Sequence, residues 1–364
     1  MKKILNITAF AALLLLAACQ NTIKYEYDLN DGKITILGEL STAREEHSVF
    51  LSMSYPDRID SLPDAAVYCY VNGERHQATK IHPGYEWRYD PVTYESILVP
   101  VRNRYTEYSF RADFKPGDKV RIEASKGKMK AWAEMEVPSR GEIVSVDTLT
   151  LVKTLSYQSI DGSDDYEQEY VEYTVSLRDV KGADSYYTLD ADKNTVTRII
   201  SEDGTEVEEQ GPVKLEYETF HDRILEDDYS SGVGDIFEDL LPVNSTHCFS
   251  DKLFRDQEAT VKFYVPSYYI KEHLYYFEGD KAEVDVAVHL RFKSFDRSYY
   301  NYLRALNNMM CYGFDVNPIV EPTMLPNNVN GGMGMVTIVA EDTWEMILPT
   351  KYYDKDDQPN YYIY

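Results

Sequence analysis

An acidic stretch at residues 221–239 carries side chains that are suited to bind a cation. Its carboxylates include Asp227, Asp228 and Asp235, with only Arg223 as an opposing cation. Calcium takes about six to eight oxygen ligands in adaptable geometry, and a loop that contains two glycines can bend around it. The spacing does not match an EF-hand, and acidic loops are commonly just solvated. The stretch is therefore interpreted as either a structural calcium site or a solvated loop.

A cluster of aromatic residues offers a second kind of chemistry, the recognition of a ligand. Tyr85, Trp87, Tyr89 and Tyr94 stand near one proline-rich turn, in a chain with 32 tyrosines against 13 phenylalanines and 3 tryptophans. Tyrosine presents a rigid apolar face and a hydroxyl at low entropic cost, which suits a glycan or peptide ligand. Strands also favour tyrosine for packing. The cluster is therefore either a binding surface or the cover of a half-buried sheet, and the tyrosines at 268–276 favour the structural role.

Catalytic motifs are mostly missing. The sequence contains no His-Glu-x-x-His, no Gly-x-Ser-x-Gly and no Cys-x-x-Cys, and its seven histidines are scattered. We therefore expect that the protein is not an enzyme and needs no cofactor beyond the calcium considered above. Glycoside hydrolysis stays an alternative, because its two carboxylates are identified by a separation of ~5–9.5 Å in space rather than by sequence spacing.

The glycine-rich run Gly331-Gly332-Met333-Gly334 invites comparison with a phosphate-binding loop. Such a loop needs a helix N-terminus after it, and a Walker-type loop ends in Lys-Ser/Thr. Here residues 335–340 continue as a strand, and no Lys-Ser/Thr pair follows. The run instead predicts a tight bend or a close approach of two backbones.

The N-terminal segment resembles the signal peptide of a bacterial lipoprotein. Lys2 and Lys3 precede an apolar run at residues 9–18, which is shorter than the ~20 residues that a bilayer-spanning helix needs. The run ends in Leu16-Ala17-Ala18-Cys19, which resembles a lipobox, with small residues ahead of a cysteine that receives a diacylglycerol. The alternative is a plain secretory signal with a chance cysteine.

The lipobox predicts an anchored mature protein. Residues 1–18 would be removed, Cys19 would carry acyl chains such as palmitate, and residues 19–32 would form a tether to the membrane. Gln20 in place of an aspartate favours delivery to the outer membrane. We expect the cell surface rather than the periplasmic face, although no acidic residue precedes Glu26 after the cysteine.

The charge balance excludes one class of partner. The chain has 62 acidic and 37 basic residues, a formal charge of −25 and a pI near 4.6. A phosphate backbone is bound by clustered lysine and arginine, so we expect no nucleic acid partner. Electrostatic adhesion to anionic lipid is disfavoured for the same reason.

The hydrophobic pattern predicts a mostly β protein with two domains. Residues 33–140 alternate apolar and polar in short runs, which is typical of a β-sandwich of immunoglobulin or fibronectin type. Residues 141–364 predict a larger, antiparallel, β-rich domain, and Asp203-Gly204 predicts a hairpin within it. One helix is expected near residues 298–311, with Asp296 or Ser298 as its N-cap.

The chain resembles the DUF4249 lipoproteins of Bacteroidetes over residues 20–345. The motifs that carry this resemblance, besides the lipobox, are Ile34-Thr35-Ile36-Leu37-Gly38-Glu39-Leu40, Pro63-Asp64-Ala65-Ala66-Val67, Ala131-Trp132-Ala133-Glu134, Phe249-Ser250-Asp251, Ser298-Tyr299-Tyr300-Asn301-Tyr302-Leu303, Glu321-Pro322 and Pro326-Asn327-Asn328-Val329-Asn330-Gly331-Gly332-Met333-Gly334. The resemblance implies an outer-membrane lipoprotein whose genes often neighbour those of TonB-dependent transporters. It implies no catalytic residues, because the activity of the family is undefined.

The sequence therefore predicts a non-catalytic outer-membrane lipoprotein, accessory to a TonB-dependent transporter in the capture of a glycan, peptide or chelate. A structural or adhesion component of the cell envelope is the alternative, and a surface glycoside hydrolase is a third interpretation. A concave, aromatic-lined surface would favour ligand capture, whereas a broad flat patch would favour assembly.

Overall fold

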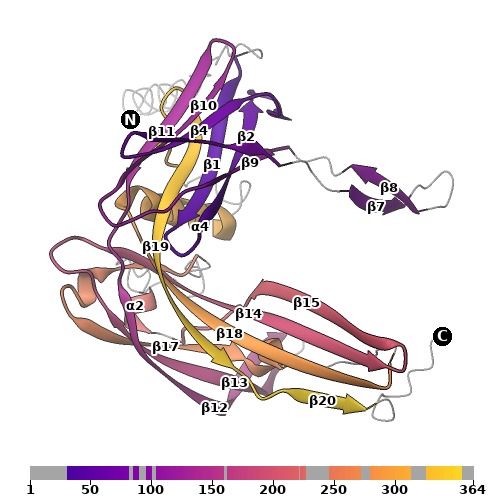
Figure 1. The fold of residues 1–364 in the computed structure, drawn as a ribbon. Coiled ribbons are helices and arrows are strands. Elements are labelled where there is room, and N and C mark those ends of the chain that lie inside the picture. The colour runs from indigo at the N-terminus through magenta and orange to yellow at the C-terminus, as the bar shows by residue number, and fades with distance from the viewer. Residues whose placement is uncertain are drawn as a thin grey trace, which may run out of the picture.

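The short alternating segments form strands that build two β units, one above the other in Figure 1. The computed structural model describes residues 31–81, 85–89, 96–100, 104–159, 162–220, 222–226, 246–271, 279–312 and 325–354. The strands in chain order are β1 (Lys33–Ser41), β2 (Glu46–Ser54), β3 (Ile59–Ser61), β4 (Ala66–Val71), β5 (Glu74–Gln77), β6 (Thr79–Lys80), β7 (Tyr85–Tyr89), β8 (Ser96–Pro100), β9 (Thr106–Arg111), β10 (Lys119–Lys126), β11 (Met129–Glu136), β12 (Glu142–Ser159), β13 (Gly162–Arg178), β14 (Tyr186–Ser201), β15 (Gly204–Lys214), β16 (Cys248–Ser250), β17 (Glu258–Pro266), β18 (Lys281–Phe295), β19 (Met333–Ile347) and β20 (Lys351–Asp354). The helical segments are α2 (Arg223–Glu226), the 3-10 turn η3 (Asp251–Leu253), α3 (Ser267–Ile270) and α4 (Arg297–Tyr312).

The first unit is a sandwich of two sheets. One sheet runs in the order β19-β1-β2-β9-β6, and the other in the order β11-β10-β4-β5. Both contribute to one apolar core, whose fully buried members include Ile36, Leu51, Ile122 and Ala133. Alternate residues along each strand point into this core. The predicted mostly β fold class, with an N-terminal sandwich, is therefore confirmed.

The second unit also has two layers. The three-stranded sheet β12-β13-β17 packs against the sheet that contains β15, β14 and β18. On the buried face of the three-stranded sheet, Tyr173 of β13 and Phe263 of β17 stack with their ring centroids 5.1 Å apart. The hairpin predicted at Asp203-Gly204 is present, because β14 pairs with β15 up to Ser201 opposite Gly204.

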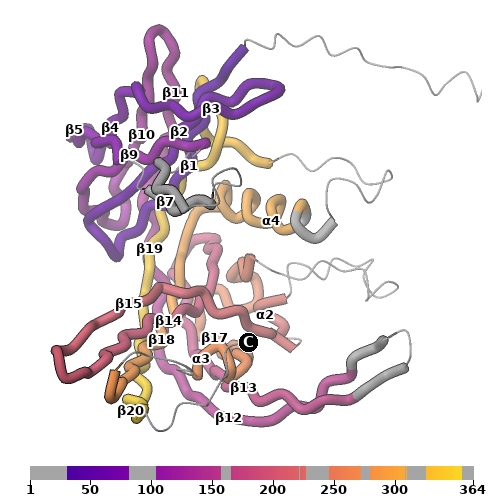
Figure 2. The backbone as a smooth tube through the Cα atoms, turned by 90° about the vertical axis from the view of Figure 1, so that its right-hand side faces the viewer, coloured from indigo at the N-terminus to yellow at the C-terminus, as the bar shows by residue number. Residues whose placement is uncertain are grey.

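Strand β19 joins the two units and is seen in yellow in Figures 1 and 2. Its residues 333–339 pair in parallel with β1 of the first unit, and its residues 340–347 pair antiparallel with β18 of the second. The first unit thus takes a strand from the far end of the chain. The division expected near residue 140 assigns β19 wholly to the second domain. The pairing of β19 with β1 joins residues about 300 positions apart, and the local sequence pattern does not reveal it.

The predicted helix is present as α4, which lies between the two units (Figure 2). Asp296 is its N-cap, because the backbone N–H of Tyr299 donates to the Asp296 carboxylate at 2.8 Å. The described parts of the chain contain three further, shorter helical segments, which are α2, η3 and α3. Of the helices described here, none is long and apolar enough to cross a bilayer.

Candidate functional site

The sheet β11-β10-β4-β5 has one buried face and one open face, because residues of β4, β10 and β11 alternate between the core and the outside. The inward residues belong to the sandwich core. The outward residues combine aromatic rings with charges of both signs; they are Tyr68, Tyr70, Arg75, Arg121, Glu123, Trp132 and Glu134. We refer to this surface as the open face. It is the candidate site.

Strand register sets the order of side chains across the open face. Tyr70 stands between Arg75 of β5 and Arg121 of β10, and Arg121 is in turn opposite Glu134 of β11. The neighbouring row places Tyr68 beside Glu123, and Glu123 beside Trp132. Directly opposite residues of an antiparallel pair lie about 5 Å apart on the same face. The row of Glu123 therefore places one charge between two rings, whereas the row of Arg121 places one ring among three charged residues.

Ion pairs hold the charged side chains of the open face in place. Arg121 donates to Glu134 at 2.8 Å and to Glu123 at 3.0 Å, and its guanidinium lies 5.0 Å from the centre of the Trp132 ring. Lys130 approaches Glu123 at 2.7 Å. Burial opposes the charge of Glu123, but the hydrogen bonds from Lys130 and Arg121 outweigh it and lower its pKa. Glu123 is therefore held as a carboxylate among cations.

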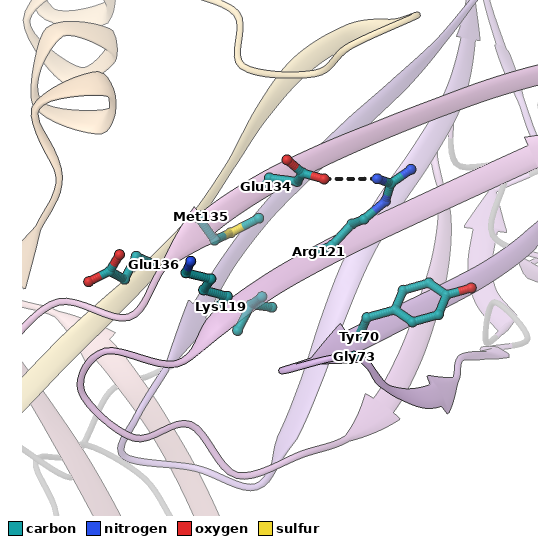
Figure 3. A pocket seen from close by; sticks show the side chains of 8 residues that line it. Tyr70, Gly73, Lys119, Arg121, Glu134, Met135 and Glu136 are labelled. Atoms are coloured by element: carbon teal, nitrogen blue, oxygen red, sulfur yellow. Dashed lines mark hydrogen bonds and ion pairs between the residues drawn. The ribbon is translucent and has the colours of Figure 1, made fainter.

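A shallow hollow of about 550 Å³ opens at one end of this face (Figure 3). It is lined by Tyr70, Gly73, Lys119, Val120, Arg121, Glu134, Met135 and Glu136. Figure 3 shows Tyr70, Arg121 and Glu134 along it, with the Arg121–Glu134 ion pair dashed. The hollow thus offers one aromatic ring together with hydrogen-bond donors and acceptors within reach of a single ligand.

A tight turn builds the rim of this hollow. Asn72 and Gly73 join β4 to β5 with φ of 50° and 89°, and two positive φ values in a two-residue loop fit a hairpin. The Asn72 side chain accepts from the Lys119 backbone N–H at 2.9 Å and donates to Asp118 at 2.8 Å. The turn is thereby fixed to the start of β10.

The hollow does not have the setting of a glycosidase site. An acid catalyst of that kind relies on apolar burial to keep its proton. The Glu134 side chain is 61% exposed and is ion-paired to Arg121. Within the described residues, no group of three His, Cys, Asp or Glu side chains is placed to hold a metal ion.

The structure places the aromatic cluster of the sequence only in part. Tyr85, Trp87 and Tyr89 stand on alternate positions of β7, which pairs with β8. That two-stranded sheet shares no ladder with another strand of the described chain. Tyr94 lies outside the described residues. A binding role for the cluster stays a prediction.

The anchor and the calcium site also stay predictions. Cys19, Asp227, Asp228 and Asp235 lie outside the described residues. The rings of the open face, in contrast, carried a usable signal in the sequence. Successive side chains of a strand point to opposite faces. Because Val67 and Cys69 are buried in the core, Tyr68 between them points outward, and Trp132 between Ala131 and Ala133 does the same.

A second cluster of polar side chains lies where the two units meet. Lys293 of β18 contacts Glu39 of β1 at 2.9 Å and Asp190 of β14 at 3.0 Å. The Tyr299 hydroxyl of α4 donates to the other oxygen of Glu39 at 2.7 Å. Burial opposes the charge of Lys293, but Asp190 and Glu39 together outweigh it and raise its pKa. We refer to this group as the junction cluster, and its role is to fasten the units together.

Two of the motifs behind the family resemblance meet at this junction. Glu39 belongs to the first of them, and Tyr299 belongs to the helical one. The glycine run lies against β1, because Gly332 and Gly334 stand so close to the carbonyls of Ile34 and Ile36 that no side chain fits. This confirms the close backbone approach that the run predicts.

Comparison with known proteins gives a family and no activity. The family model described as a domain of unknown function, DUF4249, matches residues 20–345. No curated protein matches the chain. Among solved structures, the chain is similar to a DUF4785 family protein from Legionella pneumophila, at 5% sequence identity and a TM-score of 0.20. That match covers 72% of this chain and 52% of the other, so the chain spans about half the length of that protein. The family match extends from the cysteine region through the open face and the junction cluster to β19, and the chain belongs to the DUF4249 family.

Proposed function

We propose that this protein is a non-catalytic lipoprotein of the outer membrane that binds a saccharide on the open face of its first unit. The observation that supports this most directly is that Tyr70, Arg121 and Glu134 line one hollow, beside the row in which Tyr68 and Trp132 flank Glu123. Aromatic faces stack against sugar rings, and flanking donors and acceptors bind hydroxyl groups. Capture of the ligand for a TonB-dependent transporter is the role that we assign to it, and that role rests on the family resemblance and the lipobox.

The balance of charge favours a neutral saccharide over the other ligands considered. Arg75, Arg121 and Lys130 face Glu123 and Glu134 across the same few strands, so neither sign dominates. A charged chelate would favour an excess of one sign. A peptide in extended form would pair with a strand edge, such as that of β5 at the end of this sheet, rather than lie across the rings of its face. A ligand that carries many hydroxyls matches alternating donors and acceptors.

Replacing the rings of the open face should weaken saccharide binding. We expect Tyr70→Ala and Trp132→Ala each to lower affinity by about tenfold, equivalent to ~1.4 kcal/mol of lost stacking. The probes are soluble hexasaccharides of glucose, xylose and mannose, measured by isothermal titration calorimetry. Tyr352→Ala is the matched control, because that tyrosine is 73% exposed on β20 and should leave affinity unchanged. Equal binding by all variants would refute the assignment to the open face, and hydrolysis of the probe would refute the non-catalytic role.

The anchor is tested independently of the ligand. We expect cells labelled with palmitate to incorporate label into the wild-type protein and not into Cys19→Ala, because only a cysteine thiol at that position accepts the diacylglycerol. The variant should also leave the membrane fraction, since acyl chains supply the binding to lipid. Wild-type protein without label would overturn the anchoring. If a TonB-dependent transporter is the partner, a pull-down of the labelled protein from solubilised membranes should enrich one.

A further inference from the structure

Strand β12 forms the outer edge of the sheet β12-β13-β17, and it is unusually poorly protected. Within the described residues it pairs with β13 alone, along its whole length up to Ser159 opposite Gly162. Figure 2 shows the β12–β13 ribbon reaching away from the second unit. An unpaired edge presents a row of N–H and C=O groups that can pair with another strand, so proteins usually guard it with charges, prolines or short length.

Another edge of the same unit shows such protection. Strand β15 is exposed along its length and carries Glu206, Glu208, Glu209 and Pro212. Residues 145–159 of β12, in contrast, include only two charged side chains. Leu149 and Val152 are 59% and 58% exposed on it. The contrast between the two edges indicates that another strand pairs with the β12 edge.

The two charges of this segment, Asp147 and Lys153, stand at equal distances from Thr150. Suppose that two copies of β12 pair antiparallel about a two-fold axis at Thr150. Asp147 of each copy is then directly opposite Lys153 of the other, which gives two pairs of opposite charge. Leu149 is then opposite Leu151, and Thr148 is opposite Val152. Directly opposite residues share a face, and opposite charges there stabilise the pair. A two-fold axis requires a surface that is complementary to itself, and this segment has that property.

The charged side chains share the face of the strand that such pairing uses. Asp147, Leu149, Leu151 and Lys153 share one face of β12, because they alternate with Thr148 and Thr150. The Lys153 ammonium lies on that face, 3.7 Å from the centre of the Tyr264 ring and 3.9 Å from that of Phe220. To reach Asp147 of a second copy, the Lys153 side chain stays on this face but turns from Tyr264, on the far strand of its own sheet, toward the β12 edge.

We propose that the protein forms a two-fold dimer in which β12 pairs with β12 of a second copy, centred on Thr150. The dimer joins two three-stranded sheets into one six-stranded sheet and covers both copies of Leu149. This interface lies on the second unit, and it does not depend on the ligand proposed for the open face.

Charge reversal tests the register of this dimer. We expect the full-length protein in detergent to sediment as a dimer. Asp147→Lys and Lys153→Asp should each weaken dimerisation by about tenfold or more, because each creates two pairs of like charges. The double variant restores both attractions and should return to within about threefold of wild type. Glu208→Lys, a charge reversal on the other edge, is the control and should change nothing.

A cysteine at the axis provides a second readout that does not depend on affinity. Thr150→Cys places two thiols directly opposite, within the reach of a disulfide, and should give a covalent dimer on oxidation. Thr148→Cys faces Val152 instead and should stay at the background set by wild-type protein. A monomer at every concentration, equal cross-linking of both cysteine variants, or cross-linking of Thr150→Cys to a different protein would each overturn the proposal.

Discussion

Gly334→Ala should destabilise the protein by about 3–5 kcal/mol, because a side chain at this position collides with the neighbouring backbone. Gly334 has a φ of 119°, which residues with a side chain rarely adopt, and it is opposite Ile36 in the parallel pairing of β19 with β1. A Cβ there would lie 2.0 Å from the Ile36 carbonyl oxygen. Backbone cannot swing aside as a flexible side chain does, so the strands must separate.

Urea unfolding, followed by tryptophan fluorescence, measures this effect. Gly127→Ala is the matched control, because Gly127 also has a positive φ, of 60°, but nothing lies within 4 Å of its Cβ position. Its cost should be about 1 kcal/mol, the cost of the left-handed conformation alone. If Gly334→Ala lost no more stability than Gly127→Ala, the close approach of β19 to β1 would be wrong.

Lys293→Met should cost about 3 kcal/mol, because it removes the cation from the junction cluster and leaves two carboxylates facing each other. The Lys293 side chain is only 16% exposed and contacts Glu39 and Asp190 from different units. Methionine fills a similar volume, so the loss of stability measures the removal of the charge and not the creation of a cavity. The units should therefore separate more readily, which limited proteolysis near residue 140 would detect alongside the unfolding free energy.

The pH dependence of this effect has a defined sign. The pKa of Lys293 is raised above its ordinary ~10.4, so its contribution is complete at lower pH and is lost only as pH rises beyond that value. The stability gap between wild type and Lys293→Met should thus be constant from pH 6 to 9.

Lys281→Met is the control for the junction cluster. Lys281 is on the same strand, its side chain is 67% exposed, and its ammonium is 4.0 Å from Asp354. Exposed ion pairs contribute about 0–1 kcal/mol, so this variant should be nearly neutral. If Lys293→Met and Lys281→Met lowered the free energy of unfolding equally, Lys293 would act as a surface residue and would not fasten the units.

Local features of the fold were predictable from the sequence, because they depend on residues a few positions apart. The alternation of Val67, Cys69 and Val71 requires a strand with one buried face. Asp296 ahead of an apolar repeat predicts the N-cap of α4, and the structure confirms it with the bond from Tyr299. Short-range sterics and periodicity decide such features.

The candidate site was only half predictable. The sequence groups Tyr85, Trp87, Tyr89 and Tyr94 because they are neighbours in the chain, and it predicts for them either a binding surface or the cover of a half-buried sheet. The rings of the open face come from β4 and β11 instead, and the strand register across β10 brings Tyr68 and Trp132 into one row. Distance along the chain carries no information about such neighbours.

The sequence by itself determined the strands, the helix with its cap, the anchor motif and the need for a backbone contact at the glycine run. Only the tertiary structure decided which backbone that run would touch, and that Lys293 would meet Glu39 from 254 positions away. The physical reason is that local conformation depends on a few adjacent residues. The order of strands depends instead on which arrangement of whole sheets buries the apolar side chains best. Closing a long loop costs only slightly more than closing a short one, so sequence distance excludes few pairings, and packing of the cores selects among them.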